Sequence, residues 1–247
     1  ATHFLTPRLS GNTSRLRKTD LMQQVYIPEG SFEMGNVTRD GDEEPVRQVY
    51  LDSFWIDKFE VTNGQYAQCV AAGACSKPAN TGSATRNSNY DNKTYKNYPV
   101  IYVSWYQAKE YCQWAGGDLP TEAQWEKAAR GTDGRTYPWG NDAPNSNLVN
   151  FGGNIKDTVE VGSFSRGNSP YGALDMAGNV WEWVRDWYGD YDANKTSNPT
   201  GPSSGITRVL RGGSFNGNAW GIRSANRYSD FPAYGSLYVG FRCANAP

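Results

Sequence analysis

Histidine and cysteine, the side chains that most often carry nucleophilic catalysis or bind transition metals, are scarce in this sequence. The only histidine among the 247 residues is His3, near the start of the chain. Histidine-based triads and multi-histidine metal sites are therefore not expected within the domain. The four cysteines show no Cys-x-x-Cys spacing, which argues against a zinc site.

An even number of cysteines allows two disulfides, and the sequence leaves three pairings open. Cys69 and Cys75 flank a segment short enough for a local bond. A bond between Cys112 and Cys243 would close a loop of about 130 residues and would stabilise the fold by roughly 4–5 kcal/mol in the chain-entropy model. Buried free thiols are the alternative.

The composition favours a domain with many turns and an aromatic core. The chain has 27 glycines and 13 prolines, which predicts little long helix. Nine tryptophans, 16 tyrosines and 9 phenylalanines supply much of the core. The net charge of −1 gives no basic excess for nucleic acid, and no apolar stretch is long enough to span a membrane.

The elements that must position any site are short. Residues 1–23 are expected to form a polar leader, and residues 24–247 a single domain. Thr62 and Thr121, each followed by glutamine three positions later, predict helix starts, and an apolar stripe predicts a third helix over 105–114.

Strand patterns are weaker and fall between polar segments. Strands are predicted on both sides of a turn within 24–35, over 47–56 and over 100–103, whereas 74–98 is expected to be a surface loop. The predicted fold class is α+β, with two or three helices, small antiparallel sheets and long ordered loops.

Several segments occur together in an order that resembles the formylglycine-generating-enzyme (sulfatase-modifying factor) domain family. The resemblance extends from about Gln24 to Ala244 and implies a C-type-lectin-like fold. The segments are Val25–Gly35 (VYIPEGSFEMG), Leu119–Glu126 (LPTEAQWE), Gly178–Trp183 (GNVWEW), Arg208–Ser214 (RVLRGGS) and Gly240–Cys243 (GFRC).

The resemblance also indicates what is missing. Copper-dependent oxidases of this family use two cysteines shortly after a Gly-Gly-Ser-Tyr motif, and the matching stretch 214–223 contains none. Without thiolates there is no soft-ligand site for Cu(I). The iron-dependent sulfoxide synthases of the family use histidine ligands, which the domain lacks. The sequence therefore predicts that the chain is not an enzyme and binds no copper.

Calcium is the metal that the family resemblance implies. The ligands would be the Asp175 side chain, the carbonyls of Gly178 and Val180, and Glu182, a set of hard oxygen donors. The alternative is that the two acidic residues cap turns and pair with arginines. A second site of the family would involve Asn147, the Leu148 carbonyl and Asp157. The family pattern also implies the Cys112–Cys243 disulfide, whereas Cys69–Cys75 rests on proximity alone.

The C-terminal segment has the composition of an adaptable binding surface, with small, polar and tyrosine residues between framework positions. It resembles the variable proteins of diversity-generating retroelements, in which a C-type-lectin-like domain carries a diversified C-terminal face. An ordinary, non-diversified family member is the alternative. The predicted ligand-binding residues are Phe215, Asn216, Gly217, Asn218, Trp220, Gly221, Tyr228, Ser229, Asp230, Phe231, Tyr234, Gly235, Ser236, Leu237 and Tyr238.

The function predicted from these patterns is non-catalytic ligand binding through the C-terminal face. The ligand is expected to be a protein or another macromolecule, with no nucleic acid and no membrane span. Alternatives are an oxidase of the formylglycine type with a displaced site, or an accessory or sensor domain of a larger signalling protein. The candidate disulfides favour an extracytoplasmic or cell-surface location.

Overall fold

The computed structural model describes residues 13–37 and 41–247, and the elements named here lie within those ranges. The strands are β1 (Ser14–Leu16), β2 (Gln23–Ile27), β3 (Gly30–Met34), β4 (Arg47–Leu51), β5 (Phe54–Asp57), β6 (Trp181–Trp187), β7 (Arg208–Arg211), β8 (Arg227–Asp230), β9 (Val239–Phe241) and β10 (Ala244–Asn245). The helices are α1 (Asn63–Ala71), α2 (Trp105–Trp114) and α3 (Glu122–Arg130), with 3-10 turns η1 (Gly41–Glu43), η2 (Lys93–Tyr95) and η3 (Ser165–Gly167).

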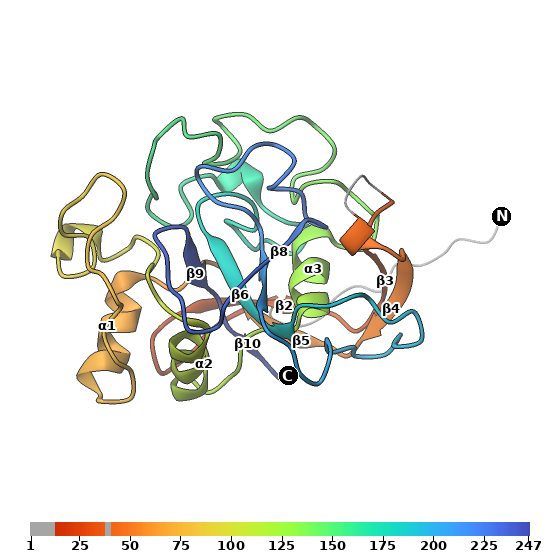
Figure 1. Ribbon diagram of the computed structural model, residues 1–247, viewed down its shortest axis with the longest axis horizontal. Helices are drawn as coiled ribbons and strands as arrows, with labels where there is room; N and C mark the ends of the chain where they lie inside the picture. The colour runs from red at the N-terminus through yellow and green to blue at the C-terminus, as the bar shows by residue number, and fades with distance from the viewer. Residues whose placement is uncertain (1–12, 38–40) are drawn as a thin grey trace.

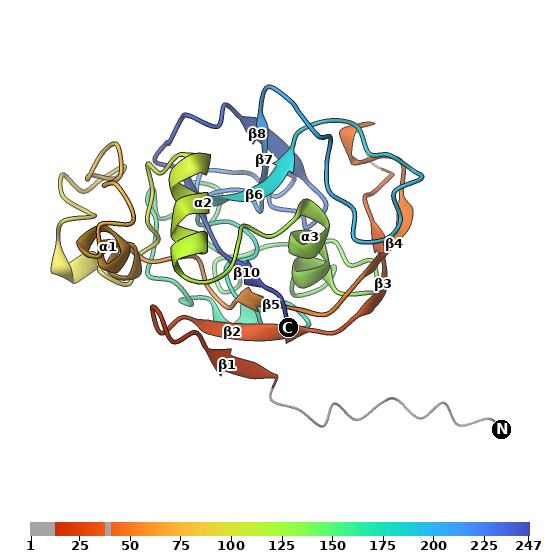
Figure 2. The same ribbon diagram turned by 90° about the horizontal axis from the view of Figure 1, so that it is seen from below.

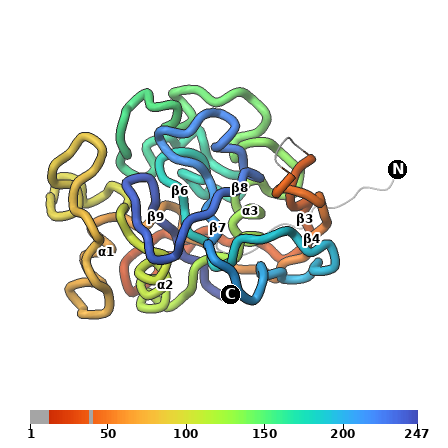
Figure 3. The backbone as a smooth tube through the Cα atoms, viewed as in Figure 1, coloured from red at the N-terminus to blue at the C-terminus, as the bar shows by residue number. Residues whose placement is uncertain are grey.

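The strands form two four-stranded sheets and one hairpin, so the predicted α+β class is confirmed. The sheets have the orders β1-β2-β5-β10 and β8-β7-β6-β9, and β3 pairs with β4 (Figure 1). The pairing of β6 with β9 is parallel, and the other strand pairs are antiparallel. Long connections between α3 and β6 form the loops at the top of Figure 3.

Each helix starts at a capping box. Thr62, Ser104 and Thr121 accept a hydrogen bond from the backbone of the glutamine three residues later, whose side chain accepts one in return. These reciprocal bonds satisfy backbone donors that the first helical turn leaves unpaired. Helix α3 ends at Gly131, which has φ 72°, a conformation that favours glycine. The three predicted helices are confirmed.

Two clusters of buried side chains make up most of the core. One joins α1, α2, β6 and β9 around Tyr66, Tyr111 and Trp183, and the other joins β2–β5 to α3 around Trp125. Both of these tryptophans are fully buried, which confirms that aromatic rings carry much of the packing. Figure 2 shows α2 and α3 between β1–β2 on one side and β6–β8 on the other.

The boundary predicted at residue 23 does not coincide with the structure. Residues 14–16 pair with β2, and the buried Arg17 guanidinium forms ion pairs of 2.6 Å with Asp20 and with Asp57 of β5. A polar sequence misled the prediction because its charges are paired within the fold rather than solvated. The first twelve residues of the predicted leader lie outside the described ranges.

Two strand predictions also need correction. The strand expected over 47–56 is divided at Asp52, whose backbone N–H donates to the Asn198 side chain at 2.9 Å, so that β4 and β5 enter different sheets. Residues 100–103 form no strand, although Val100 and Val103 are fully buried. Apolar runs of this length indicate burial without distinguishing a strand from an irregular segment.

Within residues 13–37 and 41–247, no helix is both long enough and apolar enough to cross a membrane.

Candidate functional site: a hollow on the C-terminal sheet

A hollow of about 460 Å³ opens on one face of the sheet β8-β7-β6-β9. All four strands and the loop after β7 contribute to it. Its lining residues are Trp181, Leu210, Ser214, Asn216, Gly217, Tyr228, Asp230, Ser236, Tyr238 and Val239. Pockets of roughly 300–1,000 Å³ are typical of small-ligand sites.

Strand register explains why these side chains converge. Tyr228 and Asp230 are two residues apart on β8 and share a face, because successive side chains alternate across a sheet. Leu210 lies opposite Tyr228, and Trp181 lies opposite Val239. The buried face of the same strands holds Arg211, Arg227 and Glu182, so the sheet separates an ionic interior from the open hollow.

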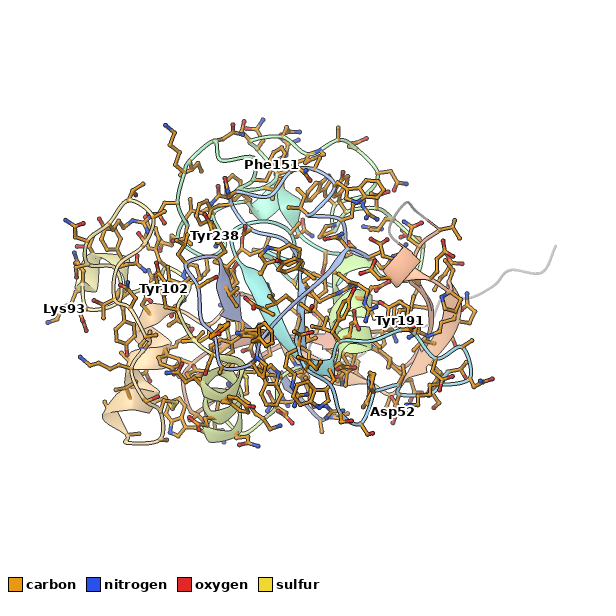
Figure 4. The ribbon with its side chains drawn as sticks, viewed as in Figure 1. Asp52, Lys93, Tyr102, Phe151, Tyr191 and Tyr238 are labelled. Carbon is orange, nitrogen blue, oxygen red and sulfur yellow. A yellow bond between two sulfur atoms is a disulfide. The ribbon has the colours of Figure 1, made fainter. Side chains whose placement is uncertain are left out.

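Aromatic rings form much of the wall. The ring centroids of Trp181 and Tyr228 are 5.4 Å apart, and those of Phe215 and Tyr238 are 5.3 Å apart. Figure 4 shows Tyr238 above β9, near the centre of the molecule. Both distances lie within the range of favourable ring contacts, which restrict the rings to defined positions.

The segment before β9 is fixed by backbone hydrogen bonds to the segment before α2. The N–H of Trp105 donates to Pro232 (3.0 Å) and the N–H of Tyr102 donates to Ser236 (2.9 Å). A Cβ on Gly235 would lie 2.5 Å from the carbonyl carbon of Tyr102, so only glycine allows this approach. Tyr102 and Tyr238 are both labelled in Figure 4. The rim of the hollow is therefore ordered although it has no regular structure.

The loop after β7 is held in a similar way. The N–H groups of Gly152 and Gly153 donate to the carbonyls of Gly217 (2.7 Å) and Phe215 (2.8 Å). Gly213 has φ 77°, and a Cβ there would lie 2.6 Å from Ile222. These contacts place Asn216 at the edge of the hollow.

The structure brings together some of the fifteen predicted ligand-binding residues but not all of them. Phe215 is only 3% exposed, so its inclusion as a surface residue is wrong; its ring packs under Tyr238. Six residues line the hollow: Asn216, Gly217, Tyr228, Asp230, Ser236 and Tyr238. The other eight are half-buried or exposed outside it: Asn218, Trp220, Gly221, Ser229, Phe231, Tyr234, Gly235 and Leu237.

The sequence prediction missed four lining residues: Trp181, Leu210, Ser214 and Val239. Trp181, Leu210 and Ser214 belong to the family motifs GNVWEW and RVLRGGS, and Val239 directly precedes GFRC. The period-two alternation of β6 and β7 was the available signal, because it places Trp181 and Leu210 on the same face as Tyr228 once the strands are paired.

The candidate calcium ligands fall into two groups. Gly178 and Val180 are buried, and within the described residues their carbonyl oxygens accept no hydrogen bond. Burial raises the pKa of Asp175 to about 6, although its carboxylate accepts a 2.6 Å hydrogen bond from Gly162. Buried carbonyl oxygens without a hydrogen-bond donor and a desolvated carboxylate are the kinds of oxygen donor that a hard cation takes.

Glu182 is already fully engaged. Arg242 donates to both of its carboxylate oxygens at 2.7 Å, and the Trp125 indole donates to one at 2.8 Å. Of the implied ligands, Asp175, Gly178 and Val180 therefore fit calcium, whereas Glu182 has the arginine pairing that the sequence analysis gave as the alternative.

The second implied calcium set is not brought together in this way. Asn147 is exposed, and Asp157 accepts hydrogen bonds from Ser83, Thr85 and the N–H of Thr158. These donors fix the 74–98 loop against Asp157 and occupy its carboxylate. Among residues 13–37 and 41–247, no group of three or more His, Cys, Asp or Glu side chains is arranged to hold a metal ion.

All four cysteines are paired. Cys112 of α2 bonds to Cys243 after β9, and Cys69 of α1 bonds to Cys75. Both predicted disulfides are confirmed, and the chain has no free thiol.

A smaller hollow of about 220 Å³ contains a titratable group whose properties are testable. Its lining includes Asp186, Glu122 and Tyr191. The Asp186 carboxylate accepts backbone N–H bonds from Glu122 (2.9 Å) and Gly201 (2.6 Å). Burial, together with the negative charge of Glu122, raises the pKa of Asp186 from 3.8 to about 6.

This shift predicts a pH dependence of stability. A carboxyl group with a raised pKa binds its proton more tightly in the folded state, so its contribution to stability falls as the pH rises from 4 to 6. Two pKa units correspond to about 3 kcal/mol. In urea titrations, the unfolding free energy of the protein minus that of Asp186→Asn should fall by about this amount between pH 4 and pH 7. A difference independent of pH would contradict the raised pKa.

Comparison with solved structures assigns the fold to a class. PvdO from Pseudomonas aeruginosa superimposes with a TM-score of 0.80 at 26% identity, covering 95% of this chain and 98% of that chain. Treponema denticola variable protein 1 gives a TM-score of 0.75 at 25% identity, covering the same shares. The architecture is the C-type-lectin-like α+β fold of formylglycine-generating-enzyme-type domains.

The family follows from the sequence match. The model of the "Sulfatase-modifying factor enzyme 1-like domain" matches residues 10–247, and the chain belongs to this family. The formylglycine-generating enzyme of Mus musculus is 32% identical, covering 95% of this chain and 78% of the relative. The kinase pkn1 of Chlamydia pneumoniae is 38% identical over 91% of this chain, and the chain spans only 38% of that relative.

These relatives contradict the prediction that the chain is not an enzyme. Formylglycine-generating enzymes at 32–33% identity match 90–95% of the chain, and a hercynine oxygenase from Mycolicibacterium smegmatis is 32% identical over 89% of it. The prediction rested on cysteine and histidine chemistry alone. The absence of those side chains from one stretch does not exclude catalysis by other groups.

Proposed function

We propose that this domain binds a protein or peptide ligand in the hollow between β8 and β9. The observation that carries the proposal is that six predicted ligand-binding residues line one hollow, on backbone that is hydrogen-bonded to neighbouring loops. Tyrosine on a fixed scaffold gives a large contact area at low entropic cost. The likeness to a variable protein of Treponema denticola supports display of a diversified face.

A random-peptide selection tests the proposal. Peptides that bind the immobilised domain should lose at least tenfold in affinity on Tyr228→Ala, because that side chain forms one wall of the hollow. Tyr106→Ala is the matched control: Tyr106 is 50% exposed against 56% for Tyr228, but lies on α2 outside the hollow. Peptides equally sensitive to both changes, or to neither, would contradict a binding site here.

Catalysis is the second candidate, favoured by the identity with named formylglycine-generating enzymes. The relevant assay incubates the domain, with and without copper, with a cysteine-containing sulfatase peptide and follows conversion to formylglycine by mass spectrometry. Turnover lost on Tyr228→Ala would place the reaction in the hollow. Absence of turnover would leave ligand binding as the function to pursue.

We also propose that Asp175 and the carbonyls of Gly178 and Val180 hold a structural calcium ion. Calcium should raise the melting temperature by several degrees over a chelator-treated sample, and Asp175→Asn should remove most of the increase. Asp157→Asn is the control, because that carboxylate is occupied by Ser83 and Thr85. Equal melting curves with calcium and with chelator would contradict the site.

The two disulfides support an extracytoplasmic or cell-surface location, where such bonds persist. The chain spans a minor part of the kinases it matches, so a role as an accessory domain within a larger signalling protein is a further proposal.

A further inference from the structure

We infer that the hollow accepts a cationic side chain, lysine or arginine, of a peptide ligand. This inference rests on the proposed binding function and specifies the chemistry of its ligand. Three independent features of the hollow support it: the aromatic walls, one uncompensated carboxylate, and the absence of any basic side chain from the lining.

Three aromatic side chains, Trp181, Tyr228 and Tyr238, line the hollow. The rings of Trp181 and Tyr228 pack at 31° to each other, and Phe215 packs against Tyr238. An ammonium or guanidinium group close to a ring face is attracted by the ring quadrupole, most strongly for tryptophan and then tyrosine. Walls built from these two residue types therefore favour an organic cation over a neutral apolar group of similar size.

Asp230 supplies the charge. Its carboxylate accepts a 2.7 Å hydrogen bond from the N–H of Phe231, and no ion pair to Asp230 exists within the described residues. The side chain is half-buried at the mouth of the hollow. A carboxylate in this position lacks a counter-ion that a bound cation would provide.

The basic residue paired with Asp230 across the sheet is directed away from it. Arg208 is the register partner of Asp230 on β7. Its guanidinium lies 3.7 Å from the ring of Trp105 and 3.4 Å from that of Trp187, and donates to the carbonyl of Arg185 at 2.6 Å. The fold thus holds the one arginine opposite Asp230 between two indoles and leaves the carboxylate facing the hollow.

The remaining lining is uncharged. Ser214, Asn216 and Ser236 offer polar groups, while Leu210 and Val239 form an apolar floor. The lining contains no lysine, arginine or histidine. An anionic ligand would therefore be repelled by the Asp230 carboxylate, with no basic side chain to offset the repulsion. A long basic side chain suits this arrangement, because its methylenes contact the floor and its charged end reaches Asp230.

The test uses Nα-acetyl-arginine amide and its neutral isostere Nα-acetyl-citrulline amide as probes, titrated into the intact domain and followed by ligand-observed NMR. The arginine probe should bind saturably and at least tenfold more tightly than the citrulline probe. Asp230→Asn should remove most of this preference while leaving citrulline binding within twofold. Asp91→Asn, which removes an exposed carboxylate with the same change in net charge, should leave both affinities unchanged.

The outcomes separate this inference from the proposed function. If both probes bind equally and Tyr228→Ala weakens both, the hollow is a binding site but its cation preference is wrong. If neither probe saturates while selected peptides bind the hollow without needing a basic residue, the inference alone fails. If neither probe binds and selected peptides ignore Tyr228→Ala, both fail.

Discussion

Replacing Arg242 by methionine is expected to lower the free energy of unfolding by about 3–5 kcal/mol, because it leaves a buried carboxylate without its partner. Arg242 and Glu182 are both fully buried and joined by two 2.7 Å hydrogen bonds. The guanidinium also donates to the carbonyls of Asp57 and Leu174. The change therefore leaves the Glu182 carboxylate and the carbonyls of Asp57 and Leu174 without their hydrogen-bond donor. These acceptors lie where the two four-stranded sheets meet.

Urea denaturation measures this loss. The control is Arg135→Met, which breaks the exposed pair with Asp133 and is expected to cost less than about 1 kcal/mol. A double variant, Arg242→Met with Glu182→Gln, should recover part of the loss by removing the unpaired charge. A single-variant loss no greater than that of Arg135→Met would show that the buried pair has no central role.

Removal of the Cys112–Cys243 disulfide is the second change with a large expected effect. The bond closes a loop of 131 residues, and the chain-entropy model gives a loss of about 5 kcal/mol when both cysteines become alanine. The Cys69–Cys75 bond has a sequence separation of only 6, for which the same model gives about 2 kcal/mol.

The two double-alanine variants serve as each other's controls, because each removes two cysteine side chains that are at most 9% exposed. Denaturation midpoints and slopes should show the larger loss for Cys112 and Cys243. Equal losses would mean that packing of the sulfur atoms, rather than restriction of the unfolded chain, sets the contribution of these bonds.

The helices were predictable from the sequence because their determinants are local. Thr62, Ser104 and Thr121 each act on an N–H group three residues away, and Gly131 ends its helix through its own conformation. The order of the motifs is equally visible in the sequence and indicates the family. Such signals survive in a single sequence because they do not depend on distant pairing.

The arrangement of the strands in the sheets, and therefore the hollow, could not be predicted, because the pairing of distant strands is not visible in a single sequence. The parallel contact of β6 with β9 joins residues more than fifty positions apart, and it decides that Trp181 faces the hollow while Glu182 faces Arg242. Trp181 and Glu182 are neighbours in one family motif, so a prediction made motif by motif gives both the same structural role. The prediction that Phe215 binds ligand was wrong for a different reason. Phe215 begins a segment of otherwise exposed and half-buried residues, but its own side chain is buried and packs against Tyr238.

The Cys112–Cys243 bond also has a mechanical consequence. Every residue that lines the hollow lies between these two cysteines, within a loop that the disulfide closes. Tension applied at the two ends of the described chain is carried across the sulfur–sulfur bond and bypasses the loop. About 130 residues, roughly 430–470 Å of extended chain, therefore stay out of the loaded path until the bond is reduced. A ligand held in the hollow remains bound to an unstretched surface while the rest of the domain bears the pull.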